Sequence, residues 1–168
     1  MSLSILQKIG WFIGLALTQV LILNNVHIAG LATPFLYIYL ILKFESDAGR
    51  NVLMLWAFFL GLLIDAFSDT PGMNASAAVA VAFVRPVIIR LFTPRDSVEA
   101  FVPSIRIMGL SSFLRYVIAS VAIHHTILLC LEYFSFARIG ILLLRIVLST
   151  ILTVTCVLAL EGMTKKHN

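Results

Sequence analysis

A run of 22 residues near the end of the chain, IGILLLRIVLSTILTVTCVLAL at Ile139–Leu160, contains a single charged residue, Arg145. A helix rises about 1.5 Å per residue, so this run covers roughly 33 Å and is long enough to cross a hydrocarbon core about 30 Å thick. Apolar stretches of about 20 residues or more are typical of transmembrane segments. The stretch therefore predicts a transmembrane helix and an all-α membrane protein.

The composition of the whole chain agrees with this prediction. Of its 168 residues, 61% are hydrophobic and 12% are charged, and the mean hydropathy is +1.05. Soluble domains have roughly 45–50% apolar and about 25% charged residues. The net charge of +4 comes from basic residues dispersed over the ends of apolar runs, so we interpret them as topology signals and expect no nucleic-acid partner.

Six apolar runs predict a compact bundle of about six transmembrane helices that forms one integral membrane domain over residues 1–168. The first run follows a basic residue as in a signal peptide, but we expect it to be retained as a helix. The second run contains Gly30 and Thr33–Pro34, which favour a broken helix or a partly inserted hairpin arm, so five spans remain possible. The approximate spans are 10–23, 26–42, 52–67, 73–92, 107–131 and 139–160.

The basic residues predict the orientation, because Lys and Arg near the ends of spans resist translocation. With six spans, one basic residue, Arg138, falls on the external side, and three others lie inside apolar runs. We therefore expect both termini in the cytoplasm. Eight basic residues then lie on the cytoplasmic side: Lys8, Lys43, Arg50, Arg90, Arg95, Arg106, Lys165 and Lys166.

Two acidic residues, Asp65 and Asp69, lie where the third run turns into the fourth through Pro71 and Gly72. Pro-Gly marks a turn, and the carboxylates are placed to accept hydrogen bonds from the turn and from the first turn of the next helix. Alternatively, Asp65 binds a partner or pairs with a buried arginine, since charges within a membrane are usually paired. Arg145 lies at a matching depth and is the expected pairing residue.

Other polar residues inside the runs also allow structural interpretations. We expect Arg85, which precedes Pro86, to extend toward cytoplasmic headgroups. The adjacent residues His124 and His125 point to different helix faces, so we expect helix–helix hydrogen bonds from them and no metal site.

Small residues occur in two of the runs. Gly10 and Gly14 are four residues apart, and the fourth run is rich in alanine from Ala75 to Ala82. Small residues allow helices to approach closely. These faces serve either packing inside the bundle or docking of another protein's transmembrane helix.

The chain contains no P-loop, HExxH, GxSxG or paired-carboxylate motif. We therefore expect a protein that is not an enzyme and that uses no cofactor. Six short helices without an internal repeat also disfavour a secondary transporter.

Three short stretches, Gly61–Asp65, Thr70–Ala75 and Ala82–Pro86, together with the size, span layout and short loops, resemble the MreD family of bacterial rod-shape membrane proteins. The resemblance implies a non-catalytic scaffold subunit of the cell-elongation complex in the bacterial inner membrane. It would associate with MreC and, through MreC, with RodA, a class B penicillin-binding transpeptidase and the actin-like MreB, and it would contact membrane lipids.

The family is also similar in fold to the S components of energy-coupling-factor vitamin transporters, which implies an alternative function. An S component needs an externally open pocket where polar groups converge on a small ligand. The candidates for such a pocket are Asn24, Asn25, His27, Asp65 and Asp69.

Overall fold

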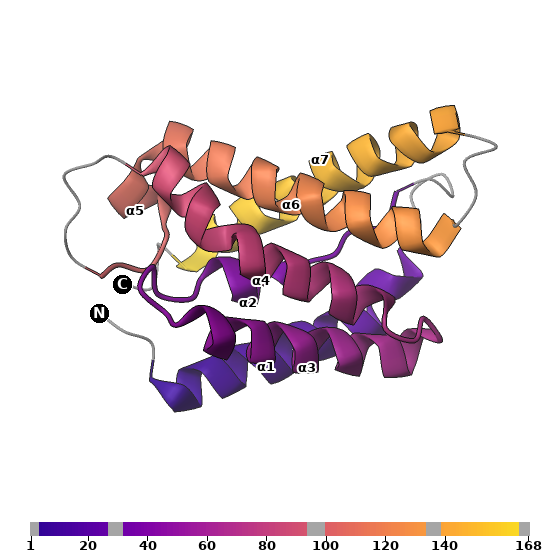
Figure 1. The fold of residues 1–168 in the computed structure, drawn as a ribbon, viewed down its shortest axis with the longest axis horizontal. Helices are drawn as coiled ribbons and strands as arrows, with labels where there is room; N and C mark the ends of the chain where they lie inside the picture. Colours follow the sequence, from indigo (N-terminus) through magenta and orange to yellow (C-terminus); the bar gives the residue numbers. More distant parts are fainter. Residues whose placement is uncertain (1–3, 27–31, 94–99, 134–138, 165–168) are drawn as a thin grey trace.

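The structure, a computed structural model, describes residues 4–26, 32–93, 100–133 and 139–164. Five segments in these ranges are helical, long and apolar enough to cross a membrane, which confirms the predicted helical architecture and is compatible with a multi-pass membrane protein. Figure 1 labels the elements in chain order. They are α1 (Ile5–Leu21), η1 (Leu23–Asn25), α2 (Ile38–Leu42), α3 (Arg50–Ser68), α4 (Met73–Phe92), α5 (Ile105–Met108), α6 (Leu110–Tyr133) and α7 (Ile139–Thr164).

Most of the predicted spans correspond to these helices. Helix α4 has the predicted bounds, and α3, α6 and α7 differ from the predicted ends by a few residues. Helix α1 begins earlier than predicted because Ser4 caps it. The Ser4 hydroxyl accepts a hydrogen bond from the Gln7 backbone at 3.3 Å, and the Gln7 side chain accepts one from the Ser4 backbone at 3.0 Å, which is a capping box.

The second predicted span, 26–42, is not a long helix in the part that the structure describes. Residues 33–36 are non-helical, and helix forms over Ile38–Leu42 alone. The residue before a proline is biased away from the helical conformation, so Thr33–Pro34 accounts for the late start. The alternative of a broken helix therefore describes this segment, and a sixth long helix is not confirmed.

Contacts between neighbouring segments define the path of the chain. Lys8 at the start of α1 forms an ion pair with Glu45 at 2.9 Å, whereas Asn24 at its end donates to Ser68 at the end of α3 at 2.6 Å. The chain therefore runs in one direction through α1, in the opposite direction through residues 32–44, and in the first direction again through α3. We call the end with Lys8 and Glu45 the terminal end, because α1 begins there and α7 ends there (Figure 1), and the end with Asn24 and Ser68 the distal end.

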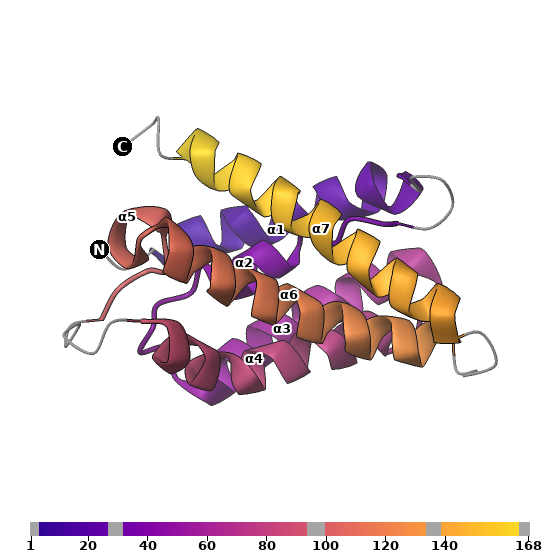
Figure 2. The same cartoon turned by 90° about the horizontal axis from the view of Figure 1, so that it is seen from above.

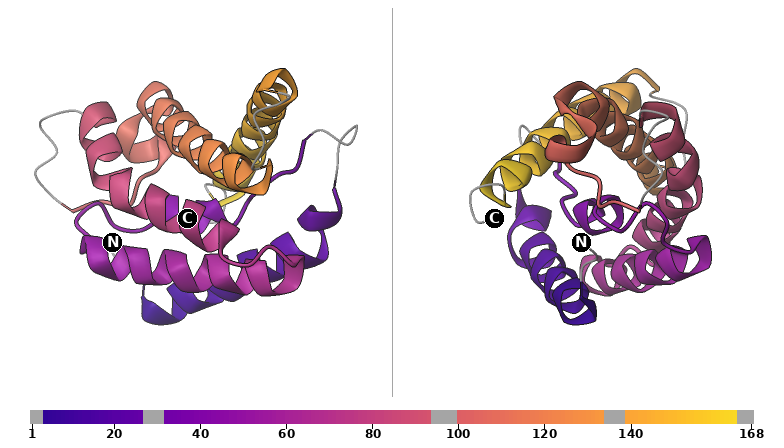
Figure 3. Two further views of the ribbon diagram at one scale, coloured as in Figure 1. Left: turned by 45° about the vertical axis from the view of Figure 1, so that its right-hand side comes forward. Right: turned by 90° about the vertical axis from the view of Figure 1, so that its left-hand side faces the viewer.

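The long helices surround the returning segment. Helix α3 packs on α4, α4 on α6 and α6 on α7, while α1 packs on α3. Viewed end-on, these helices enclose α2 (Figure 3, right), and all five residues of α2 are buried. Helices α6 and α7 lie close together toward the distal end and diverge toward the terminal end, as seen from above in Figure 2.

The small residues of α4 pack inside the bundle. Ala75, Ala77, Ala78 and Ala82 are buried, and a Cβ atom added to Gly61 of α3 would lie 2.5 Å from the Cα of Ala75. This close approach of α3 and α4 requires glycine at position 61. Of the two interpretations of the alanine-rich run, internal packing is therefore the one that the contacts support.

Candidate functional site

The most unusual feature of the bundle is the buried segment 32–44, which we call the crossing segment. A non-helical backbone cannot satisfy its own polar groups, and inside a membrane no water is available to do so. Surrounding side chains must therefore supply the hydrogen bonds. The residues that supply them form the candidate functional site.

Side chains from α1 and α7 satisfy the extended part of the crossing segment. Gln19 of α1 acts in both directions, since its amide donates to the Pro34 carbonyl at 3.0 Å and accepts from the Leu36 backbone at 2.8 Å. On α7, Ser149 Oγ accepts from the Thr33 N–H at 3.2 Å, and Thr153 Oγ1 accepts from the Phe35 N–H at 3.0 Å. Three polar side chains thus supply the hydrogen bonds that the backbone of a regular helix or strand would form with itself.

Arg85 holds the other end of the crossing segment, which corrects the prediction that it extends toward headgroups. Its side chain lies in the interior, and the residue is 1% exposed. The guanidinium donates to the carbonyls of Glu45 and Leu42, each at 3.2 Å, to the carbonyl of Phe44, and to the Tyr116 hydroxyl at 2.9 Å. Carbonyls at the C-terminus of a helix carry partial negative charge, so the end of α2 attracts this cation.

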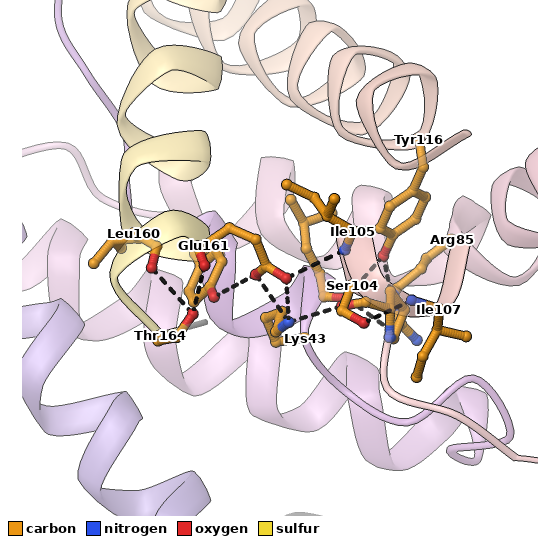
Figure 4. Close-up of polar contacts among 12 residues, drawn as sticks. Lys43, Arg85, Ser104, Ile105, Ile107, Tyr116, Leu160, Glu161 and Thr164 are labelled. Atoms are coloured by element: carbon orange, nitrogen blue, oxygen red, sulfur yellow. Dashed lines mark hydrogen bonds and ion pairs between the residues drawn. The ribbon is translucent and has the colours of Figure 1, made fainter. Parts of the chain in front are cut away.

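A second cation, Lys43, lies beside the Arg85 cluster at the terminal end (Figure 4). Lys43 Nζ forms an ion pair with Glu161 of α7 at 2.9 Å and donates to the Pro103 carbonyl at 2.8 Å. Glu161 also accepts from the Tyr39 hydroxyl at 2.9 Å and from the Ile105 N–H at 3.3 Å. The pair therefore ties together the crossing segment, α7 and the start of α5.

Asp65 caps the first turn of α4, as one of the two interpretations of the sequence predicted. Its Oδ1 accepts from the Asn74 backbone and from Thr70 Oγ1, both at 2.9 Å, and from the Asn74 side chain at 3.0 Å. Its Oδ2 accepts from the Ala75 backbone at 3.0 Å. Four donors and the positive end of the helix dipole stabilise the buried carboxylate.

The other predicted turn residues have conformational roles. Asp69 is exposed and ends α3 in the left-handed conformation at φ 52°, and among the described residues its carboxylate forms no hydrogen bond. Gly72, at φ 79°, is the N-cap residue of α4, and Pro71 is exposed in the turn between them. A positive φ favours glycine, which explains the Pro-Gly pair.

A hydrogen-bonded chain connects Asp65 with His124 in the interior. The Asn74 amide donates to Asp65, so its oxygen faces Tyr37, whose hydroxyl donates to that oxygen at 3.0 Å. The Tyr37 oxygen lies 2.6 Å from His124 Nε2, and because its own proton points to Asn74, His124 Nε2 must carry the proton of this bond. His124 Nδ1 and Ser120 Oγ have no partner among the described residues.

His125 faces α7, and the predicted divergence of the two imidazoles is confirmed. Its Nε2 lies 3.2 Å from Thr153 Oγ1, and its Nδ1 donates to the Val121 carbonyl at 2.8 Å. His124 contacts the crossing segment, and His125 contacts α7. The prediction that these histidines form hydrogen bonds between elements is correct.

The expected ion pair between Asp65 and Arg145 does not form. The ion pairs within 4.0 Å among the described residues are Lys8–Glu45 and Lys43–Glu161. Asp65 lies between α3 and α4, whereas the Arg145 guanidinium of α7 lies over the Tyr133 ring of α6 at 4.8 Å. The matching depth predicted for Asp65 and Arg145 did not bring their side chains together, because they lie between different pairs of helices.

The residues expected to line a ligand pocket do not converge in the part of the chain that the structure describes. Asn24 donates to Ser68 and accepts from Gln19, and Asn25 donates to the Leu21 carbonyl at the end of α1. His27 lies outside the described residues.

Sequence reasoning missed Gln19, Thr153 and Glu161 as site residues. All three are polar residues within or at the end of apolar runs, and all three are buried. Their rarity in such a context was the available signal, because a polar group within a membrane needs a partner. Their side-chain partners lie 5 to 122 residues away along the chain.

The fold and the site define a helical multi-pass membrane protein with a buried, side-chain-supported crossing segment. Comparison with protein-family models, with curated proteins and with solved structures gave no match.

Proposed function

We propose that this chain is a non-catalytic scaffold subunit of a bacterial cell-elongation complex, of the kind that the MreD family provides. In this proposal it is located in the inner membrane with both termini in the cytoplasm. It supports MreC directly, and RodA, the class B penicillin-binding transpeptidase and MreB through MreC.

One observation carries the proposal: the polar residues in the three stretches that resemble the family form contacts inside the bundle. Asp65, Thr70 and Asn74 join α3 to the start of α4, and Arg85 joins α4 to the crossing segment. These residues determine the shape of the bundle. A protein whose interior polar groups maintain its shape acts on its surroundings through helix faces and loops, as a scaffold does.

Helix α1 has the open face that such a scaffold needs. It is the least buried of the candidate spans. In its most apolar stretch of 18 residues, 17% are buried, against 33–44% in the corresponding stretches of the other spans. A Cβ atom added to Gly10 or Gly14 would meet nothing within 4 Å, so this small-residue face is not used inside the bundle. We infer that it receives the transmembrane helix of the partner, with the exposed turn at Asp69 and Pro71 as a second contact.

Cysteine crosslinking tests this assignment in membranes. Cysteine replaces Leu17 on the open face of α1 or Pro71 in the turn, and Val147 on α7 is the matched control, since Leu17 and Val147 are about equally exposed at 53% and 54%. The native Cys130 and Cys156 are replaced by serine. We expect crosslinks to MreC from positions 17 and 71, whereas crosslinks from position 147 alone would show that the assignment is wrong.

Purification in mild detergent tests the function class. Co-isolation of a single-span protein with a long external region supports the scaffold. A tightly retained small molecule or an associated ATPase module would instead support the alternative, an S component of a vitamin transporter.

A further inference from the structure

Arg145 is a cation within an apolar helix that has no acidic partner among the described residues. No carboxylate oxygen in those residues lies within 4.0 Å of its guanidinium, since the two ion pairs involve other residues. Its Nε is shielded from solvent and has no hydrogen-bond acceptor, although the side chain as a whole is half-buried. A charge at such a position needs a counter-charge, which must come from outside this part of the chain.

The position of Arg145 along α7 indicates where the counter-charge lies. Helix α7 has 26 residues and is therefore about 39 Å long, roughly 9 Å more than a hydrocarbon core. If the excess is shared between its ends, the Cα of Arg145, six residues after Ile139, lies about 4–5 Å inside the hydrocarbon. Helical side chains lean toward the helix N-terminus, which for α7 is the distal end, so the guanidinium extends toward the headgroup layer.

Tyr133 holds the guanidinium at this level. The ring belongs to the last residue of α6, and its centroid lies 4.8 Å from the Arg145 guanidinium carbon. Stacking on an aromatic ring restricts the guanidinium, and aromatic residues with a polar tip are typical of the membrane interface. Glu132, the neighbouring acidic residue, is exposed and does not come within 4.0 Å of the guanidinium.

We propose that Arg145 and Tyr133 form a site for the phosphate of an anionic phospholipid in the leaflet at the distal end of the bundle. The planar guanidinium matches phosphate oxygens with two parallel N–H donors. Phospholipid phosphates lie at the level that this side chain reaches. They therefore supply the missing counter-charge, and the acyl chains lie along the exposed apolar side chains of α7.

Native mass spectrometry of the full-length protein in detergent, titrated with phosphatidylglycerol, tests this site. Arg145→Gln is compared with the wild type and with Arg115→Gln, which removes an exposed arginine of α6 near the terminal end. Hydrogen bonds to charged groups contribute about 1.5–3 kcal/mol, so we expect Arg145→Gln to weaken phosphatidylglycerol binding by roughly tenfold to a hundredfold. Arg115→Gln is expected to change it less than about twofold.

Two further variants keep the test informative if Arg145→Gln folds poorly. Arg145→Lys retains the charge without the paired donors, and Tyr133→Leu retains the arginine without the ring. Both are expected to bind phosphatidylglycerol with affinities between those of the wild type and Arg145→Gln. Unchanged binding in all Arg145 variants would overturn the proposal.

A soluble competitor separates a lipid from a free anion. We expect glycerol 1-phosphate at millimolar concentration to leave phosphatidylglycerol binding unchanged. Equal competition by glycerol 1-phosphate would show a general phosphate site and overturn the lipid assignment. Loss of a co-purified protein from Arg145→Gln, with phosphatidylglycerol binding intact, would show that an acidic side chain of a partner is the counter-charge.

Discussion

Replacing Arg85 by methionine is expected to destabilise the protein, because the backbone carbonyls that Arg85 binds lose the hydrogen bonds from its guanidinium. The Leu42 carbonyl keeps a bond from the Tyr116 hydroxyl, and the Glu45 carbonyl keeps one from the Ala48 N–H. The Phe44 carbonyl loses its donor, and an unsatisfied buried polar group costs about 1–3 kcal/mol. The Tyr116 hydroxyl also loses the hydrogen bond that it accepts from Arg85. We therefore expect the free energy of unfolding to fall by about 2–4 kcal/mol in total.

Thermal unfolding in detergent, followed by circular dichroism, measures this loss. For a chain of this size, 1 kcal/mol shifts Tm by roughly 2–4 °C, so Arg85→Met should lower Tm by about 4–16 °C. Arg85→Lys should lower it less, because an ammonium replaces some of the donors but lacks the fork geometry. The exposed Arg115→Met is the matched control and should stay within about 2 °C of the wild type. If Arg85→Met unfolds like this control, the buried position of Arg85 does not support the crossing segment.

Three further substitutions test separate parts of the bundle. Asp65→Asn leaves one acceptor oxygen for the donors at the start of α4, and we expect it to cost about 1–2 kcal/mol in the same unfolding assay. Gly61→Leu places a side chain into the backbone of α4 and should abolish the monodisperse peak in size-exclusion chromatography, whereas Gly10→Leu enters open space and should leave that peak unchanged. Glu161→Gln removes the negative partner of Lys43 and should lower stability by about 1–3 kcal/mol, and Lys43→Met in the same chain should recover part of the loss. No recovery in the double variant would contradict a direct coupling of the two residues.

The sequence predicted the long helices well because hydropathy depends on each segment alone. Met73–Phe92 was predicted with its observed bounds, and the capping role of Asp65 followed from the Pro-Gly turn beside it. The role of Arg85 could not be predicted in this way, because its acceptors, the carbonyls at the end of α2, lie 40 to 43 residues earlier in the chain. Hydropathy also could not distinguish an apolar helix from an apolar crossing segment. That difference depends on side chains of other helices.

In the part of the chain that the structure describes, five long helices and the crossing segment make six passages through the bundle. An odd number of passages would place the chain ends at opposite ends of the bundle, yet Lys8 of α1 and Glu161 of α7 both bind residues at the end of the crossing segment, Glu45 and Lys43. The segment therefore counts as a passage although most of it is not helical. Its hydrogen bonds come from α1, α4, α6 and α7. The crossing segment thus joins helices that do not all pack directly on one another.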